Sequence, residues 1–170
     1  MKKIISNLKN YRIYLYLLII VIVYFYNINF TYADKVRVVD GDTIHINKVK
    51  YRLHGIDAPE IKQYCQVNEQ KYNCGLQSKN FLESLIENKE ITCKKKNIDK
   101  YKRIIATCYT EELNLNKEMV KSGWAIAYRY YSKKYINDEL FAQKNKLGMW
   151  QGSFLEPRNW RKKKKNENTI

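Results

Sequence analysis

The sequence predicts a mainly β domain with helices packed on it, an α+β arrangement, within a chain of 170 residues. Two patterns predict this class. Apolar and polar residues alternate over residues 36–53, which is the period of half-buried strands. Apolar residues recur at helical spacing over residues 75–87. Because no repeat or linker interrupts residues 34–155, we expect one domain there.

The first three strands are predicted between residues 36 and 53, separated by two short turns. Asp40-Gly41-Asp42 forms the first turn and Asn47-Lys48 the second, because these residue types tolerate turn conformations. Pro59 ends the third strand, since proline has no N–H for a sheet ladder. The alternating apolar residues are Val36, Val38, Ile44, Ile46, Val49, Tyr51 and Leu53.

A helix and two more strands are predicted next along the chain. The helix covers residues 75–87 and stops near Asn88. Strands are expected at residues 91–93 and 104–108, where alternation returns, on either side of a basic loop over residues 94–103.

Two shorter helices are predicted in the last third of the chain. Asn114 or Asn116 caps the first, which ends at Gly123. The second covers residues 135–146 and turns three side chains inward: Ile136, Leu140 and Leu147. Five short strands with helices between them fit a small closed barrel or an open sheet, and composition does not separate the two.

The first 33 residues have the layout of a secretory signal peptide. A basic head precedes an almost wholly apolar run from Tyr14 to Tyr26, and Thr31-Tyr32-Ala33 has the small-x-small pattern of a cleavage site. The run has 13 residues, fewer than the roughly 20 of a membrane span. We expect cleavage after Ala33 and a secreted or periplasmic protein. The alternative is an uncleaved anchor that tethers the protein to a membrane.

The chain is strongly basic, with 32 Lys and Arg against 17 Asp and Glu. Removal of residues 1–33, which hold four of these bases and no acid, leaves a net charge of +11. Such a surplus favours a polyanionic partner, nucleic acid above all. Residues 156–170 form a basic tail that we expect to be disordered beyond Trp160. Nothing in the sequence indicates an obligate protein partner, so we expect a monomer.

Four cysteines lie in the part that we expect to be exported, where an oxidising compartment favours disulfides. Four cysteines allow three pairings. We favour Cys65–Cys74, which would close a polar loop, and Cys93–Cys108, which would join neighbouring strands. A zinc site is less favoured, because the spacings are wide and the two histidines lie near neither pair.

A group of carboxylates and one arginine lies within 19 residues, on segments rich in turn formers. Asp42 and Asp57 could share a hard metal such as Ca²⁺, with a backbone carbonyl near Pro59 as a further oxygen ligand. Glu60 could deprotonate a water. Arg52 suits a phosphate, because its guanidinium is bidentate and stays charged. These residue types suit hydrolysis of a phosphodiester.

Phosphodiester hydrolysis calls for a second cation and a surface for nucleotides. Arg103, just before the strand at 104–108, is the candidate cation. The cluster Tyr128-Arg129-Tyr130-Tyr131 could stack bases or contact phosphates.

These residues resemble the staphylococcal nuclease (thermonuclease) family from about Val36 to Trp150. The motifs that carry the resemblance are Asp40-Gly41-Asp42-Thr43, Arg52-Leu53-x-Gly55-Ile56-Asp57-Ala58-Pro59-Glu60, Asp99-Lys100-Tyr101-x-Arg103 and Gly148-Met149-Trp150. The cysteines and the ending Gly148-Met149-Trp150-x-Gly152-x-Phe154 are similar to an exported bacterial branch. The resemblance implies an OB-fold, a five-stranded Greek-key barrel with about three packed helices.

The family resemblance also implies an activity and a site. It implies Ca²⁺-dependent cleavage of DNA and RNA that leaves 3′-phosphate and 5′-hydroxyl ends. The implied roles are Ca²⁺ binding by Asp42, Asp57 and the Ala58 carbonyl, phosphate binding by Arg52 and Arg103, general base for Glu60, and nucleotide binding by Lys100, Tyr101, Tyr128 and Tyr130.

One position departs from the family pattern. Lys102 stands where a glycine commonly precedes the second arginine, and glycine takes a positive φ more easily than lysine does. A nucleic-acid-binding OB-fold module that no longer cuts is the alternative function. That reading is disfavoured here because such modules tend to lose the catalytic set, which this chain keeps.

Overall fold

The computed structural model describes residues 12–24, 35–111 and 113–167. The chain divides into two compact units, Met1–Ala33 and Asp34–Ile170. In the first unit, residues 12–24 are helical. Among the described residues, no helix has both the length and the apolar character needed to cross a membrane. The expected cleavage site after Ala33, and the basic head before Arg12, lie outside the described residues.

The second unit is built on a mixed sheet with the strand order β1-β2-β3-β8-β7, and β9 pairs with β8. Neighbouring strands are antiparallel except β3 and β8, which are parallel. The strands are β1 (Val36–Asp40), β2 (Thr43–Ile46), β3 (Val49–Leu53), β7 (Ile91–Ile98), β8 (Ile104–Thr110) and β9 (Leu113–Asn114). The predicted strands are confirmed. The expected basic loop is shorter than predicted, because β7 continues to Ile98.

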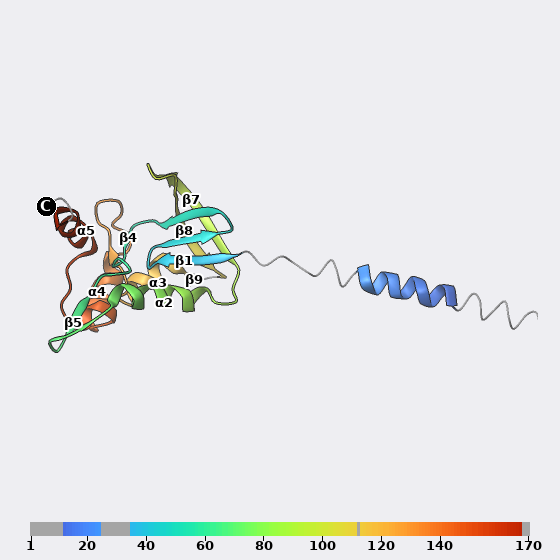
Figure 1. Cartoon of the computed structure of the whole chain (residues 1–170), viewed down its shortest axis with the longest axis horizontal. Coiled ribbons are helices and arrows are strands. Elements are labelled where there is room, and N and C mark those ends of the chain that lie inside the picture. Colours follow the sequence, from blue (N-terminus) through green and yellow to red (C-terminus); the bar gives the residue numbers. More distant parts are fainter. Residues whose placement is uncertain (1–11, 25–34, 112, 168–170) are drawn as a thin grey trace, which may run out of the picture. The chain divides into compact units, whose positions relative to one another are not determined.

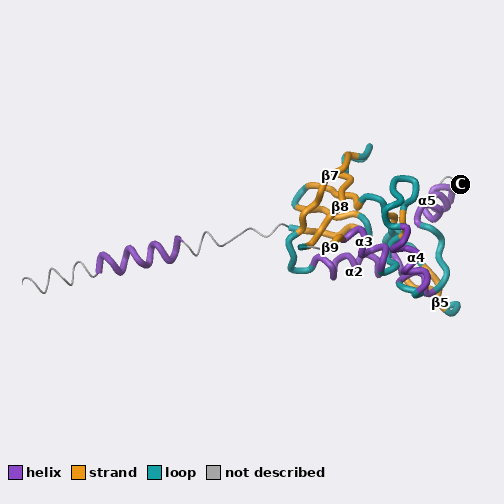
Figure 2. Tube along the Cα trace, turned by 180° about the vertical axis from the view of Figure 1, so that it is seen from behind, coloured by secondary structure: helices purple, strands orange, loops and turns teal. Residues whose placement is uncertain are grey.

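Two helices pack on one side of this sheet, as Figures 1 and 2 show: α2 (Cys74–Ile86) and α3 (Leu115–Lys121). Asparagine side chains cap both helices. Asn73 accepts the Leu76 N–H at 2.9 Å, and Asn114 accepts the Lys117 N–H at 3.1 Å. Between helices and sheet lies the main core, which includes Ile44, Leu53, Ile56, Leu82, Ala106, Leu115, Met119 and Val120.

The helix α4 (Ile136–Lys144) packs Ile136 against the main core as predicted, but the rest of its buried face differs from the prediction. Leu140 is exposed, whereas Glu139 and Ala142 are buried. Glu139 is buried because its carboxylate accepts the Ala127 N–H at 2.9 Å and pairs with Arg129. This polar contact thus overrides the apolar periodicity that suggested an inward Leu140.

The short strand β10 (Ile126–Ala127) contains Ala127, whose N–H donates to Glu139, and it lies next to a strand of the predicted site. It pairs with β4 (Ile56–Asp57), with Ile126 opposite Asp57. Glu139 of α4 therefore fixes the strand that lies beside Asp57.

Both expected disulfides are present. Cys65 of β5 (Cys65–Val67), which pairs with β6 (Gln70–Tyr72), is bonded to Cys74 at the start of α2. Cys93 and Cys108 are bonded across β7 and β8, where they are direct partners in the ladder.

The C-terminal tail is not the disordered segment that its composition suggested. A 3₁₀ turn, η1 (Gly148–Gln151), is followed by the helix α5 (Pro157–Glu167). Proline at the first position of a helix is favourable, because that position needs no N–H donor. Pro157 is also buried. In Figure 1, α5 lies beyond β4, at the end of this unit away from β7.

Candidate active site

Three residues of the predicted site meet where β2, β3 and β4 come together. Asp42 precedes β2, and its N–H donates to the Asp40 carboxylate at 3.0 Å. Its carbonyl accepts the Leu53 N–H at 2.8 Å, which ties the turn to the end of β3. Arg52 lies on β3 and Asp57 on β4. The β1–β2 turn and the β3–β4 connection therefore bring these side chains together.

Arg52 bridges the two aspartates. Its guanidinium donates to Asp42, and its other terminal nitrogen donates to Asp57 Oδ1 at 2.9 Å. The arginine side chain is 17% exposed, while the side chains of Asp42 and Asp57 are 1% and 0% exposed. Burial opposes the charged form of Arg52, but the two aspartates outweigh it and raise the pKa of Arg52. The arginine thus stays charged and holds one side of both carboxylates.

Burial also changes the protonation of the Asp42 carboxyl. Burial raises its pKa to about 7, against the opposing effect of Arg52. Asp42 also accepts the Ala58 N–H at 2.9 Å and the Thr43 hydroxyl at 3.0 Å. These donors fix the orientation of the carboxylate.

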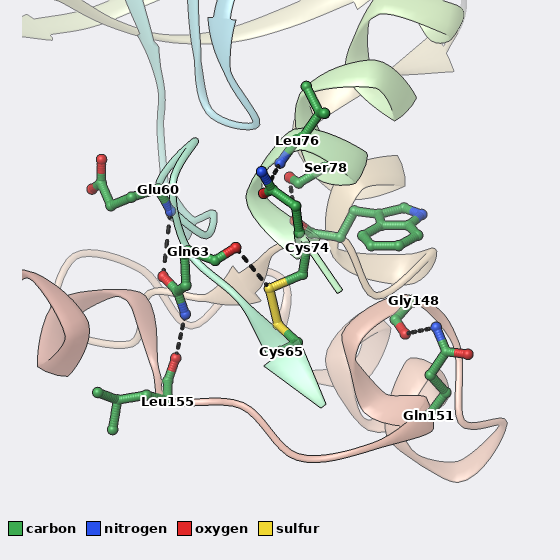
Figure 3. Close-up of a disulfide and its surroundings, with 11 residues drawn as sticks. Glu60, Gln63, Cys65, Cys74, Leu76, Ser78, Gly148, Gln151 and Leu155 are labelled. Atoms are coloured by element: carbon green, nitrogen blue, oxygen red, sulfur yellow. Dashed lines mark hydrogen bonds between the residues drawn. A yellow bond between two sulfur atoms is a disulfide. The ribbon is translucent and has the colours of Figure 1, made fainter. Parts of the chain in front are cut away.

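Glu60 sits on a loop held by the side-chain amide of Gln63. Gln63 Oε1 accepts the Glu60 N–H at 3.3 Å, and its Nε2 donates to the Leu155 carbonyl at 2.6 Å (Figure 3). The start of α2 packs closely on the same loop: a Cβ on Gly75 would lie 1.8 Å from the Glu60 carbonyl oxygen. The Cys65–Cys74 disulfide joins that helix start to β5, next to the loop (Figure 3). Sequence reasoning did not single out Gln63.

Arg161 is the residue of the site that sequence reasoning missed. It reaches from α5 and donates to both Asp57 oxygens, at 3.0 and 2.9 Å, and to Glu60 Oε1 at 2.9 Å. Burial opposes its charge, but the hydrogen bonds to Asp57 and Glu60 prevail and raise the pKa of Arg161. Arg161 begins a run of basic residues, and that context suggested a solvated tail instead of a residue of the site. The one available signal was Pro157, which is typical of a helix start.

Arg103, just before β8, contacts a different carboxylate from those of this cluster. Its side chain and its N–H donate to Asp99, at 2.8 and 2.9 Å. Arg52 pairs with Ile105, two residues after Arg103, so both arginines leave the same face of the sheet. Lys102 takes the positive φ, +62°, that the family pattern gives to glycine. The role of Arg103 in binding phosphate stays a prediction.

The expected nucleotide-binding residues fall into two groups. Tyr101 is exposed in the β7–β8 turn, with the Lys100 ammonium 5.1 Å and the Arg103 guanidinium 5.5 Å from its ring. Tyr128 lies beside the start of β4, the strand that contains Asp57. Its N–H donates to the Gly55 carbonyl at 2.9 Å.

Tyr128 belongs to a cluster of three tyrosine rings. Tyr128, Tyr130 and Tyr131 pack with ring centroids 4.9–6.4 Å apart, and Tyr130 and Tyr131 are exposed. An exposed aromatic surface near a charged site can stack nucleobases. Nucleotide binding by either group stays a prediction.

The carboxylates fit a hard cation in their chemistry. Asp42 and Asp57 offer oxygens alone, which Ca²⁺ prefers. The Arg161 guanidinium already contacts Asp57, so the site accommodates positive charge there. No group of three or more His, Cys, Asp or Glu side chains converges on one point in the described part of the chain. A cation here would therefore need backbone or water oxygens as well. Ala58 contacts the cluster through its N–H.

Comparison with known proteins places the chain in a family. Residues 50–152 match the family described as staphylococcal nuclease homologue. The chain belongs to the staphylococcal nuclease family. Its α+β architecture is the OB-fold of that family. As a member it is a nuclease, a hydrolase of phosphodiester bonds with nucleic acid as its substrate.

Several bacterial relatives match over most of their length. An uncharacterized endonuclease of Haemophilus influenzae is 36% identical over 138 residues, which cover 76% of this chain and 72% of that protein. The micrococcal nuclease of Shigella flexneri is 32% identical over 152 residues, 79% of this chain and 82% of that protein. An uncharacterized endonuclease of Escherichia coli is 34% identical over 137 residues, covering 76% and 84%.

Proposed function

We propose that this nuclease is an exported, Ca²⁺-dependent enzyme that cleaves DNA and RNA and leaves 3′-phosphate and 5′-hydroxyl ends. The observation that carries the proposal is the buried Asp42–Arg52–Asp57 cluster with Glu60 at its edge. A binding module would have no need to bury two carboxylates, which is unfavourable unless they are paired.

Each side chain has a distinct task in the proposed reaction. Asp42 and Asp57 would hold Ca²⁺, with the Ala58 carbonyl as a third oxygen. The cation would supply Lewis-acid stabilisation of the phosphate oxygens. Arg52 orients both aspartates and offers N–H donors to the substrate phosphate.

Glu60 suits the role of general base. Its side chain is 31% exposed, so water can reach it, while its backbone is fixed by Gln63. A carboxylate that is fixed in position but open to solvent can accept a proton from an attacking water.

The test incubates the purified protein with DNA or RNA, in Ca²⁺ or in EGTA, and maps the ends of the products. We expect cleavage in Ca²⁺ alone and products that a ligase joins only after their 3′-phosphates are removed and their 5′-hydroxyls are phosphorylated. Full cleavage in EGTA would exclude the Ca²⁺ role, and 5′-phosphate ends would exclude the proposed end chemistry. Glu60→Gln should lower kcat about 10²–10⁴-fold with the fold intact; a wild-type rate would remove Glu60 from the mechanism.

Export is tested separately. Mass spectrometry of protein recovered outside the cytoplasm should give a chain that begins at Asp34. An intact chain beginning at Met1 in the membrane fraction would instead indicate a tether.

A further inference from the structure

Arg161 contacts the carboxylates that the proposed reaction needs free. Its guanidinium covers both oxygens of Asp57 and one oxygen of Glu60, at 2.9–3.0 Å. Asp57 would otherwise face the cation, and Glu60 the water. Arg161 thus supplies positive charge to both of these carboxylates in the structure.

The charges of the cluster indicate what happens when a cation arrives. Ionised Asp42, Asp57 and Glu60, with Asp40 beside Asp42, carry four negative charges, and Arg52 and Arg161 carry two positive ones. A divalent cation changes the sum from −2 to 0, so the loaded cluster no longer repels the negative charge of a phosphodiester. Without Arg161 the loaded cluster would keep a net charge of −1. Both states therefore use this arginine.

The attachment of α5 allows Arg161 to change partners. The segment before the helix is fixed by the Gln63 contact to the Leu155 carbonyl, and Pro157 is buried. The Arg158 guanidinium lies 5.9 Å from the Tyr130 ring. Arg161 follows one turn later and reaches the carboxylates through its own flexible side chain. Moving the guanidinium to a neighbouring anion needs a change of rotamer, with the helix still anchored at its start.

We propose that Arg161 is a phosphate-binding residue with two positions. It neutralises Asp57 and Glu60 in the free protein, and it binds the substrate phosphate once a cation takes Asp57. The proposal rests on the Ca²⁺-dependent function given above. It gives α5 a phosphate contact in addition to the one expected of Arg103, whose guanidinium pairs with Asp99 in the structure. A substrate phosphate bound by a cation at Asp57 would offer the displaced guanidinium a new anion.

The experiment compares Arg161→Gln with Lys162→Gln in the full chain. Lys162 is the next residue of the same helix and is exposed, so the control removes the same charge without touching the carboxylates. Ca²⁺ affinity is measured by isothermal titration calorimetry without nucleic acid, and kcat/KM is measured on single-stranded DNA at saturating Ca²⁺. Arg161→Lys tests the shape of the donor, because lysine keeps the charge but lacks the fork.

The two readouts should move in opposite directions. Arg161→Gln should lower the Kd for Ca²⁺ about tenfold, because the competing guanidinium is gone. It should also lower kcat/KM about 100-fold, as loss of a donor to the transition state does. Arg161→Lys should fall between wild type and glutamine in kcat/KM, and Lys162→Gln should change either value less than about threefold.

Each contrary result has a definite meaning. An unchanged Kd for Ca²⁺ in Arg161→Gln would overturn the resting position, and an unchanged kcat/KM would overturn the phosphate-binding position. If Lys162→Gln changed the Kd for Ca²⁺ and kcat/KM as much as Arg161→Gln does, both changes would follow from the loss of one positive charge anywhere on α5. That result would overturn the proposal. If the wild-type protein itself neither binds Ca²⁺ nor cleaves with it, the proposed function fails, and this assignment fails with it.

Discussion

Removing the charge of Arg52 should destabilise the fold far more than removing the charge of Arg103. Arg52 is the counter-charge of two carboxylates that are almost fully buried, at 1% and 0% exposure. Losing one partner of a buried ion pair costs about 3–5 kcal/mol, because the other charge stays buried without it. Asp57 would keep Arg161, so we expect the lower end, about 3 kcal/mol, for Arg52→Gln.

Arg103→Gln is the matched control. It is the same substitution in an ion pair whose members are 26% and 15% exposed. Pairs near the surface contribute about 0–1 kcal/mol. The expected difference between the two variants is therefore about 2 kcal/mol, a large share of the 5–15 kcal/mol that stabilises a typical domain.

The assay is urea unfolding of the full chain, followed by tryptophan fluorescence with the disulfides intact and EGTA present. The free energy of unfolding comes from linear extrapolation, and unchanged m-values are required for the comparison. The reasoning is refuted if Arg52→Gln lies within about 0.5 kcal/mol of wild type, or if Arg103→Gln loses as much.

Three further predictions concern the site and its support. Because burial raises the pKa of Asp42 to about 7 and a cation needs the ionised form, Ca²⁺ affinity should be full above about pH 7 and fall up to about tenfold per unit below it. Calorimetry that gives one Kd from pH 5.5 to 8 would contradict this. Gly75→Ala should displace the Glu60 loop, because the added methyl group would overlap the Glu60 carbonyl oxygen. We expect kcat to fall at least about tenfold while the circular dichroism spectrum stays unchanged. A wild-type kcat would show that the loop tolerates the methyl group. Lys102→Gly should raise the free energy of unfolding by up to about 1 kcal/mol, because glycine adopts the positive φ at this position without strain. A lower free energy of unfolding in urea would contradict this prediction.

Most of the sheet could be predicted from local pattern. The alternation over residues 36–53 gave three strands, since the side chains of a half-buried strand alternate between core and solvent. The paired cysteines followed from predicted neighbouring strands, and Cys93 and Cys108 are indeed direct partners. The caps at Asn73 and Asn114 show the same local control at the starts of the two core helices.

Prediction failed where a distant contact outweighed the local pattern. Leu140 was expected inside α4, but the buried position belongs to Glu139, which satisfies the Ala127 N–H of β10. A charged residue at a buried position is stable only with partners, and sequence does not reveal partners 10 or 12 residues away. The basic run after Trp160 likewise looked like a solvated tail, because the acids that Arg161 pairs with are about 100 residues earlier.

The sequence by itself determined the chemistry available to this protein: two aspartates and a glutamate within one short region, with Arg52 between them. Those side chains lie on a turn, a strand end and a loop, and all three can be predicted from the residue types in the local sequence. Only the tertiary structure decided which charges neutralise one another. It buried Asp42 and Asp57 around Arg52, paired Arg103 with Asp99, and brought Arg161 onto Asp57 and Glu60. Ion pairing depends on distance in space, and chain folding alone sets that distance.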